Sequence, residues 1–425
     1  MRRLIALFFF AASMAPLLAD DTYTNPVIHP DNYSDISSAA DPGVFKDADG
    51  TYYCYVTGQG FPVFSSKDLV NWTYRGKAFP KARAKWATIN FWAPEVVKVG
   101  NYYYLNYTGA VTDPDPKRIG LAKSTSPVGP FDDVSSQPFY KHAEAKGCID
   151  SHIFIDEDGR TFLYYSLALR ENVVNGVNRS EIWVIELNPD LSGVKGAAKQ
   201  LFVPTLAWES NVAEGPCMVK RNGIYYLMYS GNGYGNANYA VGYATSSSPT
   251  GPFVKYADNP ILIHTGLGKK VTGTGHNSVT TSPDGKELFC VYHSHINLDE
   301  LGGGPRKVNI DRLNFTADNV MYIDGPTITP QNYPSASQAS VQPSKEESSP
   351  SFFPNPAKDE ITVVIPNSGA GNVEICDMKG RIMYSCAFPC DTSRISVPVL
   401  SLHAGIYVIC LKTADFTKKE IFIKG

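Results

Sequence analysis

The sequence predicts an all-β protein, a five-bladed β-propeller followed by a small C-terminal β-sandwich. A hairpin pattern recurs five times in the first three quarters of the 425 residues, and a run of short alternating strands occupies residues 352–425. A Ser- and Pro-rich stretch separates the two patterns. An apolar content of 43% is enough to bury a large core and to build more than one domain.

The first residues predict export. The stretch MRRLIALFFFAASMAPLLAD begins with Arg2 and Arg3, continues as an apolar run and ends in small residues, which is typical of a cleaved secretory signal. We expect residues 1–19 to be the signal peptide. No other stretch approaches the roughly 18 apolar residues that a membrane-spanning helix needs, so no membrane span is expected.

Each copy of the repeat is a short apolar strand, a tight turn and an alternating aromatic strand, the pattern of a β-hairpin. The copies begin at Asp41, Ala93, Asp150, Glu214 and His276. Several copies continue into a third strand and a Ser- and Pro-containing turn, which completes a four-stranded unit. Repetition every 52 to 64 residues predicts blades arranged around an axis over residues 22–330.

The first strand of each blade lines the central channel of a propeller, so the residues that open the repeats should converge. This brings together the carboxyl groups of Asp41, Asp150 and Glu214, with Glu95 and His276 in the corresponding neighbourhood of the other two repeats. Three carboxyls in a narrow pocket cannot all ionise at neutral pH, so one becomes a proton donor. Hydrolysis of a glycosidic bond needs such a donor and an ionised carboxylate across the sugar.

Composition excludes some partners. Lys and Arg number 38 against 41 Asp and Glu, a formal net charge of -3, so no basic surface for nucleic acid is expected. The stretch GLGKK at 266–270 lacks the spacing of a phosphate-binding loop, and GNGYGN at 231–236 is not followed by a helical pattern. The partner that the composition favours is small or neutral.

Three of the repeat openings carry a family resemblance. DPGVF at 41–45, CIDSHIF at 148–154 and EGPCMVKRNGIYYLMYS at 214–230 resemble the catalytic motifs of glycoside hydrolase family 43, and GTGHNSV at 273–279 also matches. The resemblance covers residues 25–325 and implies inverting hydrolysis of plant cell-wall polysaccharide, with release of α-L-arabinofuranosyl or β-D-xylosyl units. It implies that Asp41 is the general base, Glu214 the general acid and Asp150 the group that raises the pKa of Glu214.

The same resemblance implies roles for residues around these acids. His276 is similar to a channel histidine that in some members holds a calcium ion through water, and no other cofactor is expected. Arg306 resembles an arginine of the fifth blade that contacts the sugar. Trp92, in FWAPE, either stacks on the sugar or packs between blades, and Glu95 is either a sugar ligand or an acid behind the site.

Two further aromatic residues and two histidines are weaker candidates. Phe61 and Trp208 fall in predicted loops, where an aromatic ring could contact substrate. His293 and His295 point to the same side of a strand, which suits metal ligation, but a pair without a third ligand more often packs or hydrogen-bonds.

The last hundred residues predict a linker and a sorting module. Residues 331–351 are rich in Ser, Pro and Gln and read as a flexible linker. In residues 352–425 the order FPNPA, DMKGR, LHAGIYVI and a Lys-rich end resembles the C-terminal sorting domain of the type IX secretion system. The resemblance implies passage through the outer membrane by that machinery, followed by release or attachment at the cell surface.

Other functions stay open at this point. An endo-acting arabinanase of the same family, a propeller that binds glycans without cleaving them and an unrelated structural propeller are the alternatives, and the presence of all three acids favours an enzyme. We expect a monomer. Cys54, Cys148, Cys217 and Cys290 lie in apolar runs and are predicted to be free thiols of the core, whereas Cys386 and Cys390 are predicted to form a bridge.

Overall fold

A computed structural model describes residues 22–266, 270–297, 304–337, 351–353, 355–365, 370–389, 392, 394–413 and 417–425. The chain divides into two compact units between Gln338 and Ala339, and each is described by itself. The predicted signal peptide and most of the predicted linker lie outside the described residues. Among the residues described, no helix is long and apolar enough to cross a membrane.

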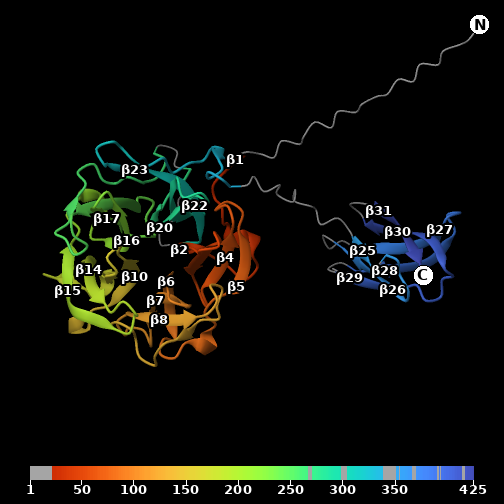
Figure 1. Ribbon diagram of the computed structural model, residues 1–425, viewed down its shortest axis with the longest axis horizontal. Helices are drawn as coiled ribbons and strands as arrows, with labels where there is room; N and C mark the ends of the chain where they lie inside the picture. Colours follow the sequence, from red (N-terminus) through yellow and green to blue (C-terminus); the bar gives the residue numbers. More distant parts are fainter. Residues whose placement is uncertain are drawn as a thin grey trace, which may run out of the picture. The chain divides into compact units, whose positions relative to one another are not determined.

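The first unit contains five four-stranded antiparallel sheets arranged around a centre, which confirms the predicted propeller (Figure 1). Blade 1 contains β2 (Ala40–Lys46), β3 (Tyr52–Thr57), β4 (Pro62–Ser66) and β5 (Thr73–Lys77). Blade 2 contains β6 (Ile89–Val99), β7 (Tyr102–Ala110), β8 (Arg118–Ser124) and β9 (Asp132–Asp133). Blade 3 contains β10 (Cys148–Ile155), β11 (Thr161–Leu167), β14 (Glu181–Leu187) and β15 (Val194–Phe202). Blade 4 contains β16 (Ala213–Arg221), β17 (Ile224–Gly231), β18 (Ala240–Ser246) and β19 (Val254–Lys255). Blade 5 contains β20 (Gly275–Thr281), β21 (Leu288–His295), β22 (Arg306–Phe315) and β23 (Met321–Ile323).

Short elements lie between the strands of the blades and at the two ends of the unit. They are β1 (Thr22–Tyr23), β24 (Gln331–Asn332), the hairpin β12 (Val173–Val174) and β13 (Val177–Asn178), and the 3-10 turns η1 (Pro30–Asn32), η2 (Lys81–Arg83), η3 (Ala143–Ala145), η4 (Leu169–Glu171) and η5 (Ala207–Glu209). The ring is closed by the N-terminal segment, because β1 pairs with β24 and Ile28 bridges to Val308 of blade 5.

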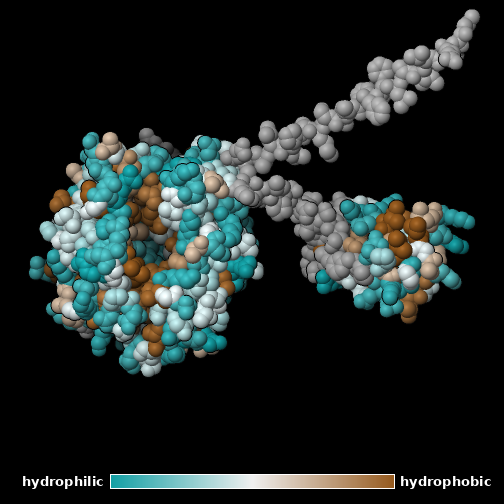
Figure 2. All heavy atoms as spheres, viewed as in Figure 1, coloured by the Kyte–Doolittle hydropathy of each residue, from teal (hydrophilic) through white to brown (hydrophobic). Residues whose placement is uncertain are grey.

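Hydrophobic side chains fill the seams between neighbouring blades. Five buried clusters lie in the five seams, and that between blades 1 and 2 includes Phe61 and Phe79, whose ring centroids are 6.1 Å apart. Each fully buried side chain of this size contributes about 1.5–3 kcal/mol. The propeller face seen in Figure 2 is hollowed at the centre of the ring, beside a group of hydrophobic residues (brown).

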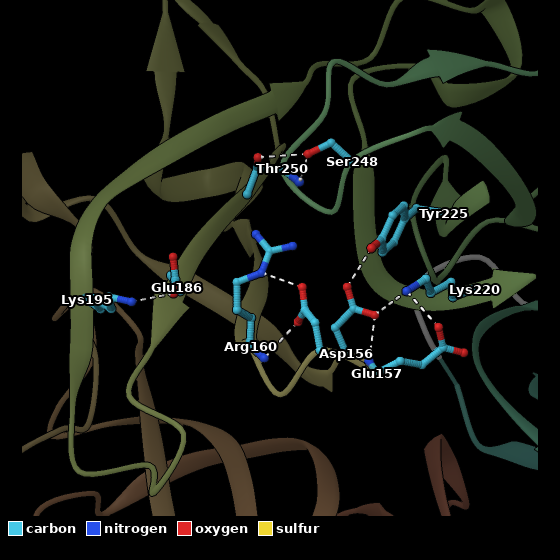
Figure 3. A network of polar contacts seen from close by, with 10 residues as sticks. Asp156, Glu157, Arg160, Glu186, Lys195, Lys220, Tyr225, Ser248 and Thr250 are labelled. Carbon is cyan, nitrogen blue, oxygen red and sulfur yellow. Dashed lines mark hydrogen bonds and ion pairs between the residues drawn. The ribbon is translucent and has the colours of Figure 1, made fainter. Parts of the chain in front are cut away.

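Polar clamps tie the hairpin turns of one blade to the next. Asp156, in the turn between β10 and β11, accepts hydrogen bonds from Lys220 Nζ at 2.6 Å and Tyr225 Oη at 2.5 Å on blade 4 (Figure 3). The seam between blades 1 and 2 repeats this clamp with Asp47, Lys98 and Tyr103. These turns follow the ends of the inner strands, so the clamps hold the propeller at the rim opposite the starts of those strands.

The second unit is a small β-sandwich. One sheet contains β25 (Ser351–Phe353), β26 (Glu360–Val364) and β29 (Arg394–Pro398), and the other contains β27 (Gly371–Asp377), β28 (Ile382–Phe388), β30 (Gly405–Thr413) and β31 (Thr417–Lys424). A buried cluster that includes Ile361, Val373 and Ile409 lies between the sheets. The alternating pattern of this segment therefore forms the predicted sandwich.

Cys54, Cys148, Cys217 and Cys290 are buried free thiols, as predicted. Cys386 also carries a free thiol, so the bridge predicted for it is wrong. Cys390, its expected partner, lies outside the described residues.

Candidate active site

In the first strand of every blade, a β-bulge places a residue in the left-handed region at an equivalent position. These residues are Asp41 (φ 52°), Ala93 (φ 45°), Asp150 (φ 56°), Gly215 (φ 58°) and His276 (φ 48°). A bulge inserts an extra residue and redirects a side chain, and Asp tolerates the left-handed region better than most residues. The fold thus offers five equivalent positions around the channel.

Glu214 is offset by one residue from this set. Its equivalents are the residues just before the left-handed ones, which include Trp92 and Ile149. The sequence repeat placed Glu214 in phase with Asp41 and Asp150, but the left-handed position of blade 4 is occupied by Gly215, and the carboxyl group lies on the residue before it. The three carboxyls nevertheless line one cavity of about 170 Å³. The other lining residues are Thr57, Trp92, Ile149, Tyr234, Tyr239, His276 and Arg306.

Hydrogen bonds from the preceding blade hold the backbone of both aspartates. The Asp41 N–H donates to His293 Nδ1 at 3.1 Å, and the Asp150 N–H donates to Thr108 Oγ1 at 3.0 Å. Thr57 Oγ1 donates to Asp41 Oδ2 at 2.5 Å and accepts from the Ala93 N–H at 2.7 Å. Blades 5 and 2 therefore hold the strands that carry Asp41 and Asp150, and Thr57 of blade 1 holds the Asp41 carboxyl group.

Asp41 is held in its ionised form. Burial alone would raise its pKa, but the Arg306 guanidinium, with Nη1 at 3.0 Å from Asp41 Oδ1, and the nearby His276 hold the pKa well below its usual range. Asp41 is only 9% exposed, so this ion pair is poorly screened by water. The site thus contains a carboxylate able to accept a proton.

Asp150 and Glu214 behave in the opposite way. Burial raises the pKa of Asp150 well above its ordinary value, and the charges of Glu214 and Asp41 raise it further. Burial also raises the pKa of Glu214, to about 7, although Tyr239 Oη donates to Glu214 Oε1 at 2.8 Å and opposes the rise. The two groups therefore hold at least one proton between them near neutral pH.

Two histidines flank Asp41 in their neutral forms. Burial lowers the pKa of His293 to about 3, and its Nδ1 accepts the Asp41 N–H, so the ring proton lies on Nε2. Burial also lowers the pKa of His276, whose Nδ1 lies 3.4 Å from Asp41 Oδ1. His293 therefore positions Asp41. This agrees with the hydrogen-bonding role that was predicted as the alternative to metal ligation.

The side chains around His276 bear on the predicted calcium ion. Within the described part of the chain, no group of three or more His, Cys, Asp or Glu side chains is arranged to hold a metal. A calcium ion at His276 would thus depend on water ligands, as the resemblance implies, and this calcium stays a prediction.

Glu95 lies outside the cavity that the three acids line. It follows the left-handed Ala93 by two residues, and its Oε2 is 2.8 Å from His152 Nδ1. Because His152 Nε2 accepts the Met218 N–H at 3.1 Å, its ring proton lies on Nδ1 and is donated to Glu95. Glu95 therefore connects blades 2, 3 and 4 behind the site.

Trp92 and Arg306 line the cavity with the acids, as expected for residues that contact a sugar. Phe61 does not: it is fully buried in the seam between blades 1 and 2. Trp208 packs against Tyr229, with ring centroids 5.6 Å apart, and is not among the lining residues. Sequence analysis missed Thr57, Tyr234 and Tyr239, because none of them opens a repeat.

A five-bladed propeller whose channel strands bring three carboxyls into one cavity defines the class of glycoside hydrolases built on this fold. The chain matches the model for glycosyl hydrolases family 43 over residues 23–321, and it belongs to this family. It is therefore a glycoside hydrolase. Residues 351–424 match the secretion system C-terminal sorting domain, so the protein is exported to the cell surface or beyond, and the secretion machinery is a partner.

Relatives and solved structures agree with this assignment. The chain is 36% identical over 270 residues to the β-D-galactofuranosidase of Aspergillus niger, covering 60% of this chain and 71% of that protein. It is 31% identical to the arabinoxylan arabinofuranohydrolase of Bacillus subtilis over 60% of this chain, but spans only 53% of that relative. A thermostable family-43 glycoside hydrolase matches with 41% identity and a TM-score of 0.68, covering 74% of this chain and 99% of that one. A structure named endo-1,4-β-xylanase from Bacteroides thetaiotaomicron matches with 36% identity and a TM-score of 0.60, covering 69% of this chain and 96% of that one.

Proposed function

We propose that this chain is an inverting exo-glycosidase that removes single α-L-arabinofuranosyl units from plant cell-wall polysaccharide. The observation that carries the proposal is the single cavity in which an ionised Asp41 faces the protonated pair of Asp150 and Glu214. An inverting enzyme needs one carboxylate and one carboxylic acid on opposite sides of the sugar.

In the proposed mechanism, Asp41 accepts a proton from a water molecule as the water oxygen bonds to the anomeric carbon. Glu214 gives its proton to the glycosidic oxygen as the bond from that oxygen to the anomeric carbon breaks. The anomeric carbon inverts because the water enters opposite the leaving group. Exchange with solvent then removes the proton from Asp41 and restores one to Glu214.

The neighbours of the acids support these roles. Asp150 disfavours ionisation of Glu214 by its buried negative charge whenever it loses its own proton. The Arg306 guanidinium, whose Nη1 lies 3.0 Å from Asp41 Oδ1, keeps Asp41 ionised, and Arg306 lines the cavity, where it can contact a sugar hydroxyl. Tyr239 holds Glu214 in place by the hydrogen bond at 2.8 Å.

Cavity size and the relatives support the substrate. The cavity volume of about 170 Å³ is small, which suits one sugar ring better than a continuous chain. Two relatives above 30% identity are named as enzymes of furanosides. α-L-Arabinofuranose and β-D-galactofuranose share the arrangement of their ring bonds and differ outside the ring, so β-D-galactofuranoside is the second candidate. Release of β-D-xylosyl units and endo cleavage of arabinan are the remaining candidates, and the experiment below includes a substrate for each.

The test is hydrolysis of 4-nitrophenyl α-L-arabinofuranoside, β-D-galactofuranoside and β-D-xyloside and of linear arabinan by the full chain. Glu214→Gln should lower kcat on the polysaccharide at least about a hundredfold, and less on an aryl glycoside with a good leaving group. Glu186→Gln, whose partner Lys195 lies at the surface, is the matched control. Proton NMR of the first product should show the inverted anomer. Retention of configuration would refute the mechanism, and a xyloside preference would refute the substrate.

The steps above use only carboxyl groups of the chain. We propose that the calcium ion predicted at His276 is not required for turnover and that the chain acts as a monomer. Treatment with a chelator and light scattering test these two points.

A further inference from the structure

The connection between β17 and β18 of blade 4 docks onto blade 5. It covers residues 232–239 and contains most of the GNGYGN stretch. The Gly273 N–H donates to the Ala237 carbonyl at 3.1 Å, and His295 Nε2 lies 2.8 Å from the Tyr234 carbonyl oxygen. A carbonyl oxygen can only accept, so His295 Nε2 carries a proton and donates it to this bond.

The histidine that holds this loop is itself fixed. His295 is 1% exposed, and its N–H donates to the Thr272 carbonyl at 2.9 Å. The ring has room because residue 273 is a glycine, and a Cβ atom on Gly273 would lie 2.2 Å from His295 Nε2. His295, a candidate metal ligand in the sequence, therefore anchors the backbone of Tyr234.

The Tyr234 side chain lies against Arg306. The guanidinium carbon of Arg306 is 5.0 Å from the centroid of the Tyr234 ring, and both residues line the catalytic cavity. Arg306 and His295 are directly paired across β22 and β21. Two neighbouring residues of blade 5 thus contact Tyr234, one at its carbonyl and the other at its ring.

Few other contacts fix the Arg306 guanidinium. In the described part of the chain, its one hydrogen bond runs from Nη1 to Asp41 Oδ1 at 3.0 Å, and its buried Nε has no partner. A single hydrogen bond lets the planar group rotate, whereas an aromatic ring stacked on it restricts rotation and excludes water. The contact with Tyr234 therefore supplies the second constraint on the guanidinium.

We propose that Tyr234 is a positioning residue, whose ring holds the Arg306 guanidinium against Asp41 and whose loop is anchored by His295. The inference rests on the proposed function, in which Asp41 accepts the proton of the attacking water. Tyr239, in the same loop, donates to Glu214. One connection of blade 4 thus positions groups beside both the base and the acid.

The test changes Tyr234 alone and together with Arg306→Gln. Tyr234→Leu removes the ring, and Tyr234→Phe keeps it without a hydroxyl that forms no hydrogen bond in the described chain. Tyr102→Leu is the matched control, because the Lys123 ammonium lies 5.0 Å from the Tyr102 centroid and the residue is 41% exposed, against 47% for Tyr234. Tyr102 does not line the catalytic cavity. Thermal unfolding of every variant checks that it folds.

We expect Tyr234→Leu to lower kcat/KM on the best aryl glycoside of the panel about five- to thirtyfold, mainly through kcat, as the loss of a desolvated cation–π contact predicts. Tyr234→Phe should lose less than about twofold, and Tyr102→Leu should change nothing. In the Arg306→Gln background, Tyr234→Leu should cost less than about a further twofold, because the group that it positions is gone. Equal losses in both backgrounds, or equal losses in the Leu and Phe variants, would overturn the inference.

NMR separates this inference from the proposed function. In the full chain labelled with ¹⁵N at arginine, the Nε–H signal of Arg306 is the one that is lost in Arg306→Gln. Tyr234→Leu should shift this signal, because the ring current is removed, and should speed its exchange with water. Tyr102→Leu should do neither. These changes would support the inference even if the wild-type chain cleaved none of the panel, and an unchanged signal would overturn it.

Discussion

Removal of the Arg306 charge should shift the acid side of the pH profile. In the folded chain Arg306 Nη1 lies 3.0 Å from Asp41 Oδ1, and both side chains are nearly buried, at 12% and 10% exposure. Arg306→Gln keeps a polar side chain of similar reach but removes the charge. Burial of Asp41, which raises its pKa, would then be opposed mainly by His276 and His293, which lower it less than Arg306 does.

The size of the change in the Asp41 pKa follows from the distance between Arg306 Nη1 and Asp41 Oδ1. Coulomb's law with an effective dielectric of about 20 gives about 5 kcal/mol at this distance, an upper value because water enters when the arginine side chain is removed. Opposite charges this close lower the pKa of a carboxyl by about one to three. We therefore expect the acid limb of kcat/KM to move upward by about one to three pH units in the variant.

The assay is kcat/KM of an aryl glycoside between pH 3.5 and 8, since this ratio reports the ionisation of the free enzyme. The wild type should keep its activity on the acid side, where Asp41 stays ionised. The variant should lose activity as pH falls, in addition to a lower level throughout from the lost sugar contact. Arg312→Gln is the control, because Arg312 lies on the same strand, β22, and pairs with Glu287 at 2.8 Å outside the cavity. An unchanged acid limb in Arg306→Gln would refute the role of this charge.

Three further predictions follow from the structure. Tyr239→Phe removes the hydrogen bond that lowers the pKa of Glu214, so the alkaline limb of kcat/KM should move upward by about one pH unit, and a fixed limb would contradict this. The pKa of Glu214 rises from 4.5 to about 7 on folding, so above pH 4.5 the unfolded chain releases a proton that the folded chain keeps, and stability falls as pH rises to about 7. Glu214→Gln should therefore stabilise the propeller by about 3 kcal/mol at pH 8 and by nothing measurable at pH 4, as urea unfolding will test. Asp156→Asn, which weakens the clamp with Lys220, should cost about 1–3 kcal/mol with aryl-glycoside turnover retained. Asp158→Asn, at an exposed ion pair, should cost less than about 1 kcal/mol, and equal melting temperatures of the two variants would argue against the clamp.

Much of the fold could be predicted because each hairpin is local. The turn and the alternating strands of a repeat lie next to each other in sequence, so five copies were visible and their first strands could be placed at the channel. Closure of the ring could not be predicted, because the pairing of β1 with β24 and of Ile28 with Val308 joins residues about three hundred positions apart. Nothing in a short stretch specifies such a contact.

The sequence predicted the three acids of the candidate site. It did not predict the strand position of Glu214 or the residues that hydrogen-bond to the acids. Strand alternation predicts which face a side chain points to, but a bulge shifts that alternation by one residue without a clear sequence signal. Glu214 was placed level with Asp41 because each begins its repeat in the sequence, although the bulge position of blade 4 is Gly215, and Glu95 was placed in their neighbourhood. Thr57 and Tyr239 were missed because Thr57 ends a second strand and Tyr239 lies in a connection between strands. The sequence contains 25 tyrosines, and no motif distinguishes Tyr239 from the others.

The one-residue offset of Glu214 separates the carboxyls into two kinds. Asp41 and Asp150 occupy left-handed positions whose N–H groups are bound by the preceding blade, and they are only 9% and 8% exposed. Glu214 occupies the position that carries Trp92 in blade 2 and Ile149 in blade 3, and it is held there through its side chain by Tyr239. A base that must stay ionised benefits from a fixed ion pair, whereas an acid that loses and regains a proton in each turnover needs contact with the cavity. The propeller supplies both environments from equivalent strands, because the left-handed bulge position is a carboxyl residue in blades 1 and 3 and a glycine in blade 4, where the residue before it carries the carboxyl group.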